Sequence, residues 1–417
     1  MLAAMRSSGK SWFIASLAFL VLGLSRGLQS SFGVFNVALL QTFGWSRAGT
    51  AGIYSLNLVV DAVLSPIVGY LLDRYGPKKI VGAGCLTLAA GLFLSSQVSS
   101  LWQLYFGFGL LAGSGLTFMG MVPHVFLVSE WFSSNRGSAI GLVYAGTGVG
   151  IMILAPLAEW LISHWGWARS FEIFAAVVVC LLFPIVSFFY RDGPYGEKLR
   201  HPAEPRKDQN HWTARLALQS LQFWLLFFAR ICAASGTTVI VIHQVAHVVD
   251  VGYSKLFAAT IFGLVGITST CGRVVFGLVA DLLSKQAAYT LNIVTSVIGV
   301  AALVILRDPS QTWLLYVYLV FFGIGFGSRA VIFSALTADI FSGKGFGSIL
   351  GYSTVAVGVG GALGSWLGGA LYDWTGSYTI SFTLSLIVLC GSDVCIWLSA
   401  MPSVIEYDRR LWGRTQK

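Results

Sequence analysis

The chain has 417 residues, of which 56% are hydrophobic and only 10% are charged, and its mean hydropathy is +0.77. A soluble domain carries about 25% charged residues, so this composition excludes an ordinary soluble protein. The apolar runs are continuous and about 20 residues or longer, which predicts membrane-spanning helices, since barrel strands would alternate with a period of two. The sequence therefore predicts an all-α membrane protein.

The net charge of +9 is explained by the location of the basic residues. With both termini in the cytoplasm, twelve helices place 18 of the 26 Lys and Arg residues on cytoplasmic segments and four on external loops. This asymmetry follows the positive-inside rule, so the charge does not indicate a nucleic-acid partner. The expected surroundings are the lipid bilayer of the plasma or inner membrane.

Twelve apolar segments are expected to cross the membrane in two groups of six. The predicted helices are 11–36, 47–72, 79–99, 101–131, 137–163, 170–190, 219–249, 255–282, 287–306, 311–338, 345–372 and 378–400. Between the sixth and the seventh, the chain is polar and rich in proline and charge, as is typical of a linker. We predict an N-terminal six-helix half at 1–190, a cytoplasmic linker at 191–216 and a C-terminal six-helix half at 217–417.

The two halves resemble each other in sequence. GYLLDRYGPKK from Gly69 matches GLVADLLSKQ from Gly277, an offset of 208 residues. FSSNRGSAIG from Phe132 matches FSGKGFGSILG from Phe341, an offset of 209. Two matches at nearly the same spacing indicate a duplication. Internal repeats are typical of secondary transporters, whose substrate site lies near the bilayer midplane at the interface between the repeats.

The first copy of this loop resembles the cytoplasmic loop motif between helices 2 and 3 of the major facilitator superfamily. The matching residues are Gly69, Asp73, Arg74, Gly76 and Lys78. The small residue Gly69 is expected to allow close helix packing. The carboxylate of Asp73 is expected to cap a neighbouring helix or to pair with a basic residue such as Arg136. We interpret this cluster as a gate.

The second copy of the loop is degraded, although it keeps the acidic residue Asp281. Leu282 stands in place of the arginine and Ser284 in place of the glycine. We include Asp281 among the gate residues.

Longer segments resemble the monocarboxylate transporter family and its bacterial oxalate/formate-type relatives. They are EWFSSNRGSAIGLVYAGTGVG (130–150), HWGWARSFEI (164–173), HVVDVGYSKLFAATIFGLVGITSTCGRVVFGLVAD (247–281) and ADIFSGKGFGSILG (338–351). In that family an arginine of helix 8 binds the carboxylate, and Arg273 matches it. Animal members carry an aspartate four residues earlier, where this chain has Ser269, and a lysine in helix 1, whose nearest match is Ser30. The resemblance implies a carboxylate site and leaves the proton carrier open.

Arg273 lies eight residues before Asp281, which is about 12 Å along a helix and therefore near the middle of a ~30 Å hydrocarbon core. A charge at that depth is costly, so it usually faces a polar cavity and meets a counter-ion or an anionic ligand. A guanidinium binds a carboxylate through two parallel hydrogen bonds. We therefore predict that Arg273 binds the substrate.

Arg329 lies ten residues before Asp339, about 15 Å along its helix. If Arg329 faced the same cavity as Arg273, two arginines could bind a dicarboxylate. The alternative is a role in pocket lining or helix packing.

His243 and Asp61 are the two candidates for proton coupling. Histidine can hydrogen-bond a carboxylate or carry a proton near neutral pH, although His243 could also be a packing residue. Asp61 is the most plainly buried acid, and its alternative is a structural pair with a basic residue. Arg26 is the obvious partner, but counting along the helices places Arg26 nearer the outside and Asp61 nearer the inside.

Further polar side chains could complete the substrate site. The candidates are Tyr144, Tyr316, Asn57, Ser30, Ser269 and His243. Most membrane aromatic residues face lipid or pack against other helices, so packing is the alternative for each tyrosine.

The sequence as a whole predicts a secondary active transporter of small monocarboxylates such as L-lactate or pyruvate, working as a proton symporter by alternating access. The alternatives are a carboxylate or dicarboxylate exchanger of oxalate/formate type, or another organic-anion or drug carrier of the same fold. The expected partners are a small carboxylate anion, a proton and lipid, and the protein is expected to be a monomer. We predict no enzyme activity, no cofactor and no metal site, because no phosphate loop, metal cluster or nucleophile–base constellation is visible.

Overall fold

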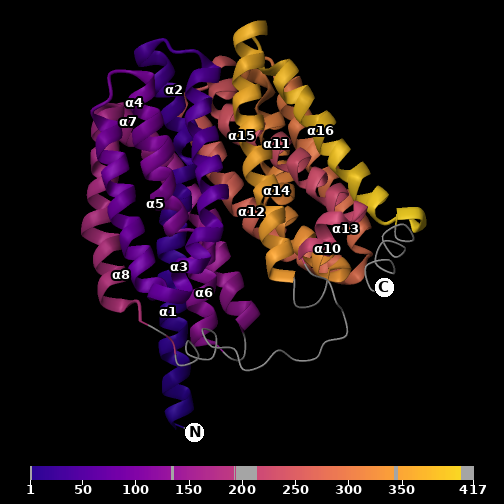
Figure 1. The fold of residues 1–417 in the computed structure, drawn as a ribbon. Coiled ribbons are helices and arrows are strands. Elements are labelled where there is room, and N and C mark those ends of the chain that lie inside the picture. The colour runs from indigo at the N-terminus through magenta and orange to yellow at the C-terminus, as the bar shows by residue number, and fades with distance from the viewer. Residues whose placement is uncertain (1, 133–135, 192, 194–213, 342–345, 405–417) are drawn as a thin grey trace. The chain divides into compact units, whose positions relative to one another are not determined.

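The computed structural model describes residues 2–132, 136–191, 193, 214–341 and 346–404, and the statements below concern these residues. Every regular element in the described part of the chain is a helix, and it contains no strand (Figure 1). The prediction of an all-α protein is therefore confirmed.

The N-terminal helices are interrupted at several points. Their bounds are α1 Leu2–Ser30, α2 Phe32–Phe43, α3 Arg47–Ser96, α4 Leu101–Leu104, the π-helix η1 Tyr105–Ala112, α5 Gly113–Phe118, α6 Met121–Trp131, α7 Arg136–Val177, the π-helix η2 Val178–Leu182 and α8 Phe183–Phe189. Two breaks fall inside single apolar spans, one at Ser31 and one at Met119–Gly120. The first span runs to Phe43, so the predicted end at residue 36 was too early.

The C-terminal spans are single unbroken helices. Their bounds are α10 Ala214–Gln219, α11 Leu221–Asp250, α12 Lys255–Leu282, α13 Lys285–Ile305, the 3-10 helix η3 Pro309–Gln311, α14 Thr312–Ile340, α15 Phe346–Thr375 and α16 Tyr378–Ser399. Most of these bounds lie within a few residues of the predicted ones, since strong hydropathy and short polar turns mark both ends of each helix.

Two glycines divide long helical segments into separate membrane spans. The described residues contain 11 helical segments that are long and apolar enough to cross a membrane, but Ser138–Phe189 has 52 residues. At 1.5 Å per residue it would measure about 78 Å, more than twice the hydrocarbon core. Gly166 breaks it with φ 79° and ψ 164°, and Gly76 breaks α3 in the same way. These left-handed turns favour glycine. The prediction of twelve helices is confirmed.

The chain forms two compact units. Unit 1 contains residues 1–203 and 244–267, and unit 2 contains residues 204–243 and 268–417. Within unit 1, the segment 244–267 is tied to the N-terminal helices by polar contacts. Arg47 pairs with Asp250 at 2.8 Å, and Lys255 Nζ donates to Gln41 Oε1 at 2.5 Å.

Small residues allow close helix packing inside each unit. In unit 1, a Cβ on Gly27 of α1 would lie 2.5 Å from the carbonyl oxygen of Gly150 in α7. In unit 2, a Cβ on Gly364 of α15 would lie 2.6 Å from Thr238 Oγ1 of α11. Backbones approach this closely only when side chains are small, which is the common packing mode of membrane helices.

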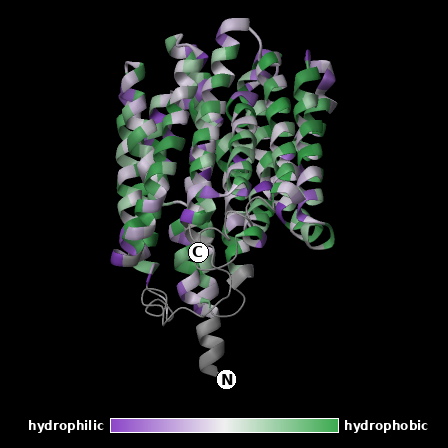
Figure 2. Cartoon of the chain, turned by 45° about the vertical axis from the view of Figure 1, so that its right-hand side comes forward, coloured by the Kyte–Doolittle hydropathy of each residue, from purple (hydrophilic) through white to green (hydrophobic). Residues whose placement is uncertain are grey.

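Hydrophobic residues run along the length of most helices, and the polar residues gather mainly near the helix ends (Figure 2). This distribution is expected of helices whose outer faces contact hydrocarbon, where exposed polar groups would cost free energy.

Candidate functional site

Arg273 lies in the C-terminal half of α12, nine residues before its end, and is half-buried. Its Nε donates to the backbone carbonyl of Gly327 on α14 at 3.2 Å. The two helices meet closely here, because a Cβ on Gly272 would lie 2.8 Å from the carbonyl carbon of Ile324. This contact fixes the base of the guanidinium and therefore the direction of its two terminal amino groups.

Ser269 lies one turn before Arg273 and is fully buried. Its backbone packs against Gly327, the residue that also accepts from Arg273. The structure therefore brings the predicted Ser269 and Arg273 together on one face of α12, where Ser269 takes part in the α12–α14 contact.

Arg329 on α14 is buried and surrounded by neutral oxygen atoms. Its Nη1 donates to Thr237 Oγ1 and to the carbonyl of Ala233 on α11, its Nη2 donates to Ser296 Oγ on α13 at 2.8 Å, and its Nε lies 3.4 Å from Asn292 Oδ1. No carboxylate of the described residues pairs with it. Arg329 thus joins three helices of unit 2, as expected of a packing role.

His243 on α11 is fully buried within unit 2. Its Nε2 lies 2.9 Å from the carbonyl oxygen of Ser365 and its Nδ1 lies 3.3 Å from the Tyr378 hydroxyl. A carbonyl oxygen can only accept, so Nε2 carries the proton. Gly368 leaves room for the ring, since a Cβ there would lie 2.6 Å from it. The surroundings of His243 are those of a satisfied packing residue.

Unit 1 contains a network of four polar side chains on α1 and α3. Arg26 Nη1 donates to Gln29 Oε1 at 2.6 Å, and Gln29 Nε2 donates to Asn57 Oδ1 at 2.8 Å. Arg26 Nη2 lies 3.9 Å from Asp61 Oδ1. The expectation that Arg26 and Asp61 lie at different depths was therefore wrong, and the two residues form an ion pair. Asn57 is fully buried in this network.

Three predicted side chains remain, namely Tyr316, Tyr144 and Ser30. Tyr316 is 53% exposed on α14, on the same face as Trp313, which is 62% exposed. That face carries exposed apolar residues, as expected of contact with lipid. Tyr144 is half-buried on α7, and Ser30 is half-buried at the end of α1.

The gate motif lies at the turn between the two spans of α3. Gly76 makes the turn, and Arg74 and Lys78 are exposed on either side of it. No described atom lies within 4 Å of a Cβ built on Gly69. The close packing expected at Gly69 therefore stays a prediction.

Three gate residues have side chains outside the described part of the chain, namely Asp73, Arg136 and Asp281. Their expected pairing stays a prediction.

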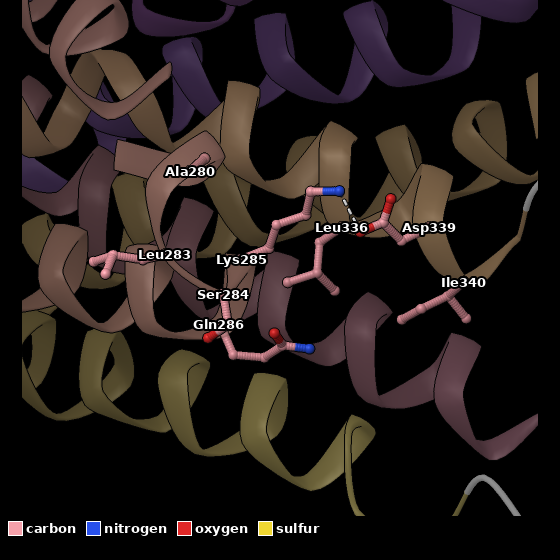
Figure 3. A pocket seen from close by; sticks show the side chains of 8 residues that line it. All are labelled: Ala280, Leu283, Ser284, Lys285, Gln286, Leu336, Asp339 and Ile340. Carbon is pink, nitrogen blue, oxygen red and sulfur yellow. Dashed lines mark hydrogen bonds and ion pairs between the residues drawn. The ribbon is translucent and has the colours of Figure 1, made fainter. Parts of the chain in front are cut away.

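The degraded second copy of the loop lines a pocket of about 400 Å³ between the ends of α12, α13 and α14 (Figure 3). Lys285 and Asp339 form an ion pair across it, and both are partly exposed. Ser284, which replaces the glycine of the first copy, accepts a hydrogen bond from the Ala287 amide at 3.2 Å and so caps α13. The replacement has changed a turn residue into a helix cap.

Sequence reasoning missed Gln29 and His124. Gln29 joins Arg26 to Asn57, and its position three residues after Arg26, on the same helix face, was the available signal. His124 is fully buried beside the Met119–Gly120 break, and its Nδ1 lies 2.7 Å from the Gly120 carbonyl oxygen. The sequence GMVPHV, with glycine and proline close together, could have indicated the break.

Comparison with known proteins defines the class of this chain. Residues 15–329 match the family described as Major Facilitator Superfamily, and the chain belongs to that superfamily. Solved structures agree on the fold. A bacterial homolog to the human lysosomal transporter Spinster matches 93% of this chain and 96% of its own, with 13% identity and a TM-score of 0.74. The nucleoside transporter NupG matches 94% and 98%, with 14% identity and a TM-score of 0.73.

Within the superfamily the chain is related to the monocarboxylate transporters. Monocarboxylate transporter 13 of Rattus norvegicus is 31% identical over 407 residues, covering 95% of this chain and 91% of that protein. Monocarboxylate transporter 11 of Homo sapiens is 29% identical, covering 95% and 84%. Monocarboxylate transporter 2 of Rattus norvegicus is 27% identical, covering 83% and 74%. The chain is a membrane transporter and not an enzyme.

Proposed function

We propose that this protein carries small monocarboxylates such as L-lactate or pyruvate across the membrane together with a proton, by alternating access. The observation that supports this most is Arg273, a guanidinium held by the Gly327 carbonyl within a membrane-spanning helix. A cation at that depth needs an anion or a polar cavity. The names of the related monocarboxylate transporters agree with a carboxylate as that anion.

In the proposed cycle, Arg273 binds the carboxylate, whose negative charge offsets that of the guanidinium, and a proton enters with it, so that the transported pair carries no net charge. In this proposal the protein without substrate changes conformation less readily than the loaded protein, which couples substrate movement to proton movement. We place the protein in the plasma or inner membrane as a monomer, with both termini in the cytoplasm.

The surroundings of Arg329 favour a monocarboxylate over a dicarboxylate. A two-carboxylate ligand would need a second cation, and the donors of Arg329 already bind four oxygen atoms of unit 2. Recruiting Arg329 would leave those buried oxygens without their donor, at about 1–3 kcal/mol for each unsatisfied group.

Uptake of labelled L-lactate into proteoliposomes tests the proposal. An inward proton gradient should drive uptake into vesicles without internal substrate, and an uncoupler should abolish it. Arg273→Ala and Arg273→Lys should remove uptake, since a point charge cannot replace the two parallel hydrogen bonds of a guanidinium. Arg307→Lys, in an exposed loop, is the matched control.

Normal L-lactate transport by Arg273→Lys protein, at equal amounts in the membrane, would contradict the proposal. Uptake that needs internal lactate or oxalate, and not a proton gradient, would establish the exchange alternative instead.

A further inference from the structure

The contact between Arg26 and Asp61 is the loosest in the network of unit 1. The 3.9 Å between Nη2 and Oδ1 exceeds the roughly 2.7–2.9 Å of a charge-assisted hydrogen bond. The Asp61 side chain is 28% exposed, although it lies inside a membrane-spanning segment. An ionised carboxylate facing hydrocarbon would be costly, so the exposed part of Asp61 faces water or another polar space. A proton can therefore reach Asp61 without unfolding the unit.

The other end of the guanidinium is fixed. Gln29 accepts from Arg26 Nη1 and is itself held by Asn57, whose Nδ2 lies 3.4 Å from the carbonyl oxygen of Phe108. These amides carry no charge and do not titrate. A change in the charge of Asp61 therefore acts on Nη2, the part of Arg26 that the amides do not hold.

A second set of acceptors lies beside Nη2. The helix break at Met119–Gly120 ends α5, and a Cβ built on Gly120 would lie 2.9 Å from Arg26 Nη2, 2.9 Å from the Thr117 oxygen and 3.3 Å from the Leu116 oxygen. Carbonyl groups at the end of a helix carry partial negative charge. The absence of a side chain at Gly120 leaves the space through which the guanidinium can reach them.

Two further titratable groups face this pair, Tyr54 from α3 and His124 from α6. Both lie within electrostatic range of Arg26, and Tyr54 also lies within range of Asp61. The His124 Nδ1 donates to the Gly120 carbonyl, because a carbonyl can only accept, and its Nε2 is buried without a described partner. His124 thus holds the backbone of the helix break next to Arg26.

We propose that Arg26 and Asp61 form a charge switch that couples proton uptake to transport, which rests on the proton-coupled function proposed above. One proton binds an Asp61 carboxylate oxygen, and the attraction between Asp61 and Nη2 is lost. Nη2 then donates to the Thr117 and Leu116 carbonyls. When the proton leaves, the Asp61 carboxylate attracts Nη2 again, so one proton enters and one leaves in each cycle.

The proposed charge switch assigns proton coupling and substrate binding to different residues. His243, the other predicted proton carrier, is fully buried, and both of its ring nitrogens lie within hydrogen-bond distance of protein oxygens. Arg273 binds the anion in unit 2, and the Arg26–Asp61 pair carries the proton in unit 1.

The test uses Asp61→Asn, which mimics a permanently protonated carboxyl. Purified protein is placed in vesicles containing a pH-sensitive dye, and two rates are measured with L-lactate as the probe. One is proton influx accompanying lactate, and the other is exchange of lactate at equal pH on both sides. Asp61→Asn should lose lactate-dependent proton influx while exchange continues. Asp393→Asn is the matched control, since Asp393 is another membrane acid and accepts from Thr290.

Two variants keep the proposal testable if Asp61→Asn fails to fold. Asp61→Glu retains a titratable carboxyl and should retain lactate-dependent proton influx. Gly120→Ala narrows the space beside Nη2 and should slow coupled uptake. Gly141→Ala is its control, because a Cβ on Gly141 meets no described atom within 4 Å.

The outcomes distinguish a failure of the proposed charge switch from a failure of the proposed function. If wild-type vesicles move lactate with protons and Asp61→Asn does the same, the switch is overturned and symport stands. If Gly120→Ala behaves like Gly141→Ala, the movement of Nη2 toward the carbonyls is overturned. Wild-type vesicles that move lactate without protons, or move no lactate, overturn the proposed function and the switch together.

Discussion

Arg26 in unit 1 and Arg329 in unit 2 are both arginines on membrane-spanning helices, but different groups compensate their charges. Arg26 has an acidic neighbour at 3.9 Å, and both members of that pair are partly exposed. Arg329 is buried and binds neutral oxygens from two neighbouring helices, α11 and α13. The neutral groups that bind Arg329 do not titrate. A carboxylate paired with an arginine can lose its negative charge by binding a proton. The comparison indicates that Arg329 has a structural role and that the Arg26–Asp61 pair can respond to protonation.

The largest expected effect on the free energy of unfolding comes from replacing Arg329. Arg329→Met removes the guanidinium donors that reach the buried hydroxyl oxygens of Thr237 and Ser296, so we expect a loss of about 3 kcal/mol or more in the free energy of unfolding. Thermal unfolding in detergent measures it. Arg26→Met should lose clearly less, because Arg26 donates to one buried acceptor, Gln29, and its other partner, Asp61, is partly exposed. Equal losses in the two variants would remove the distinction between the arginines.

A smaller effect is expected where α1 packs on α7. Gly27→Ala places a Cβ 2.5 Å from the Gly150 carbonyl oxygen, so the helices must separate. We expect a loss of about 1–3 kcal/mol, as for other overpacked sites. Gly69→Ala, at an open position, should change the free energy of unfolding little. The same unfolding assay applies, and a Gly27→Ala protein as stable as Gly69→Ala would show that the close contact is absent.

A double-mutant cycle on Arg26→Met and Asp61→Asn measures the interaction free energy between the two residues. We expect a coupling free energy of about 1 kcal/mol, because the residues touch but are partly exposed. The cycle compares the unfolding free energies of the wild type, both single variants and the double variant. Strict additivity would mean that the pair is not formed in the membrane.

The smallest effect is expected at the outer ion pair of unit 1. Arg47 and Asp250 are 17% and 37% exposed in their side chains. Asp250→Asn should therefore cost only about 0.2–1 kcal/mol. The difference should shrink further at high ionic strength, where exposed charges are screened. Unfolding measured at low and high salt checks this, and a large effect that salt leaves unchanged would place the pair in a buried setting.

Because α12 is one unbroken helix, counting residues from its end measures distance along it, and the mid-membrane depth of Arg273 stays a prediction. The same counting failed for Arg26. It assumed a span ending at residue 36, whereas the span runs to Phe43. An error of seven residues displaces a side chain by about 10 Å along a helix. Counting therefore placed Arg26 too near the outside and missed its pair with Asp61.

Side-chain roles were less predictable than helix positions. Hydropathy marks a span, but it does not reveal which face of the span meets another helix. His243 and Arg329 were candidates for substrate contact because of their charge and depth, and the structure surrounds each with protein acceptors. The packing that satisfies them comes from helices distant in sequence, which no local pattern encodes. The gate pairing of Asp73 with Arg136 stays a prediction.

The exposed aromatic face of α14 has a consequence for how deeply unit 2 sits in the bilayer. Trp313 and Tyr316 lie near the N-terminal end of that helix, and their rings are amphipathic. Such residues collect in a belt at the boundary between headgroups and hydrocarbon. These two residues are expected to hold α14 at a fixed depth in the bilayer. Arg329 lies 16 residues after Trp313, which is about 24 Å along the helix. A thinner bilayer would tilt the helix instead of moving the arginine toward water.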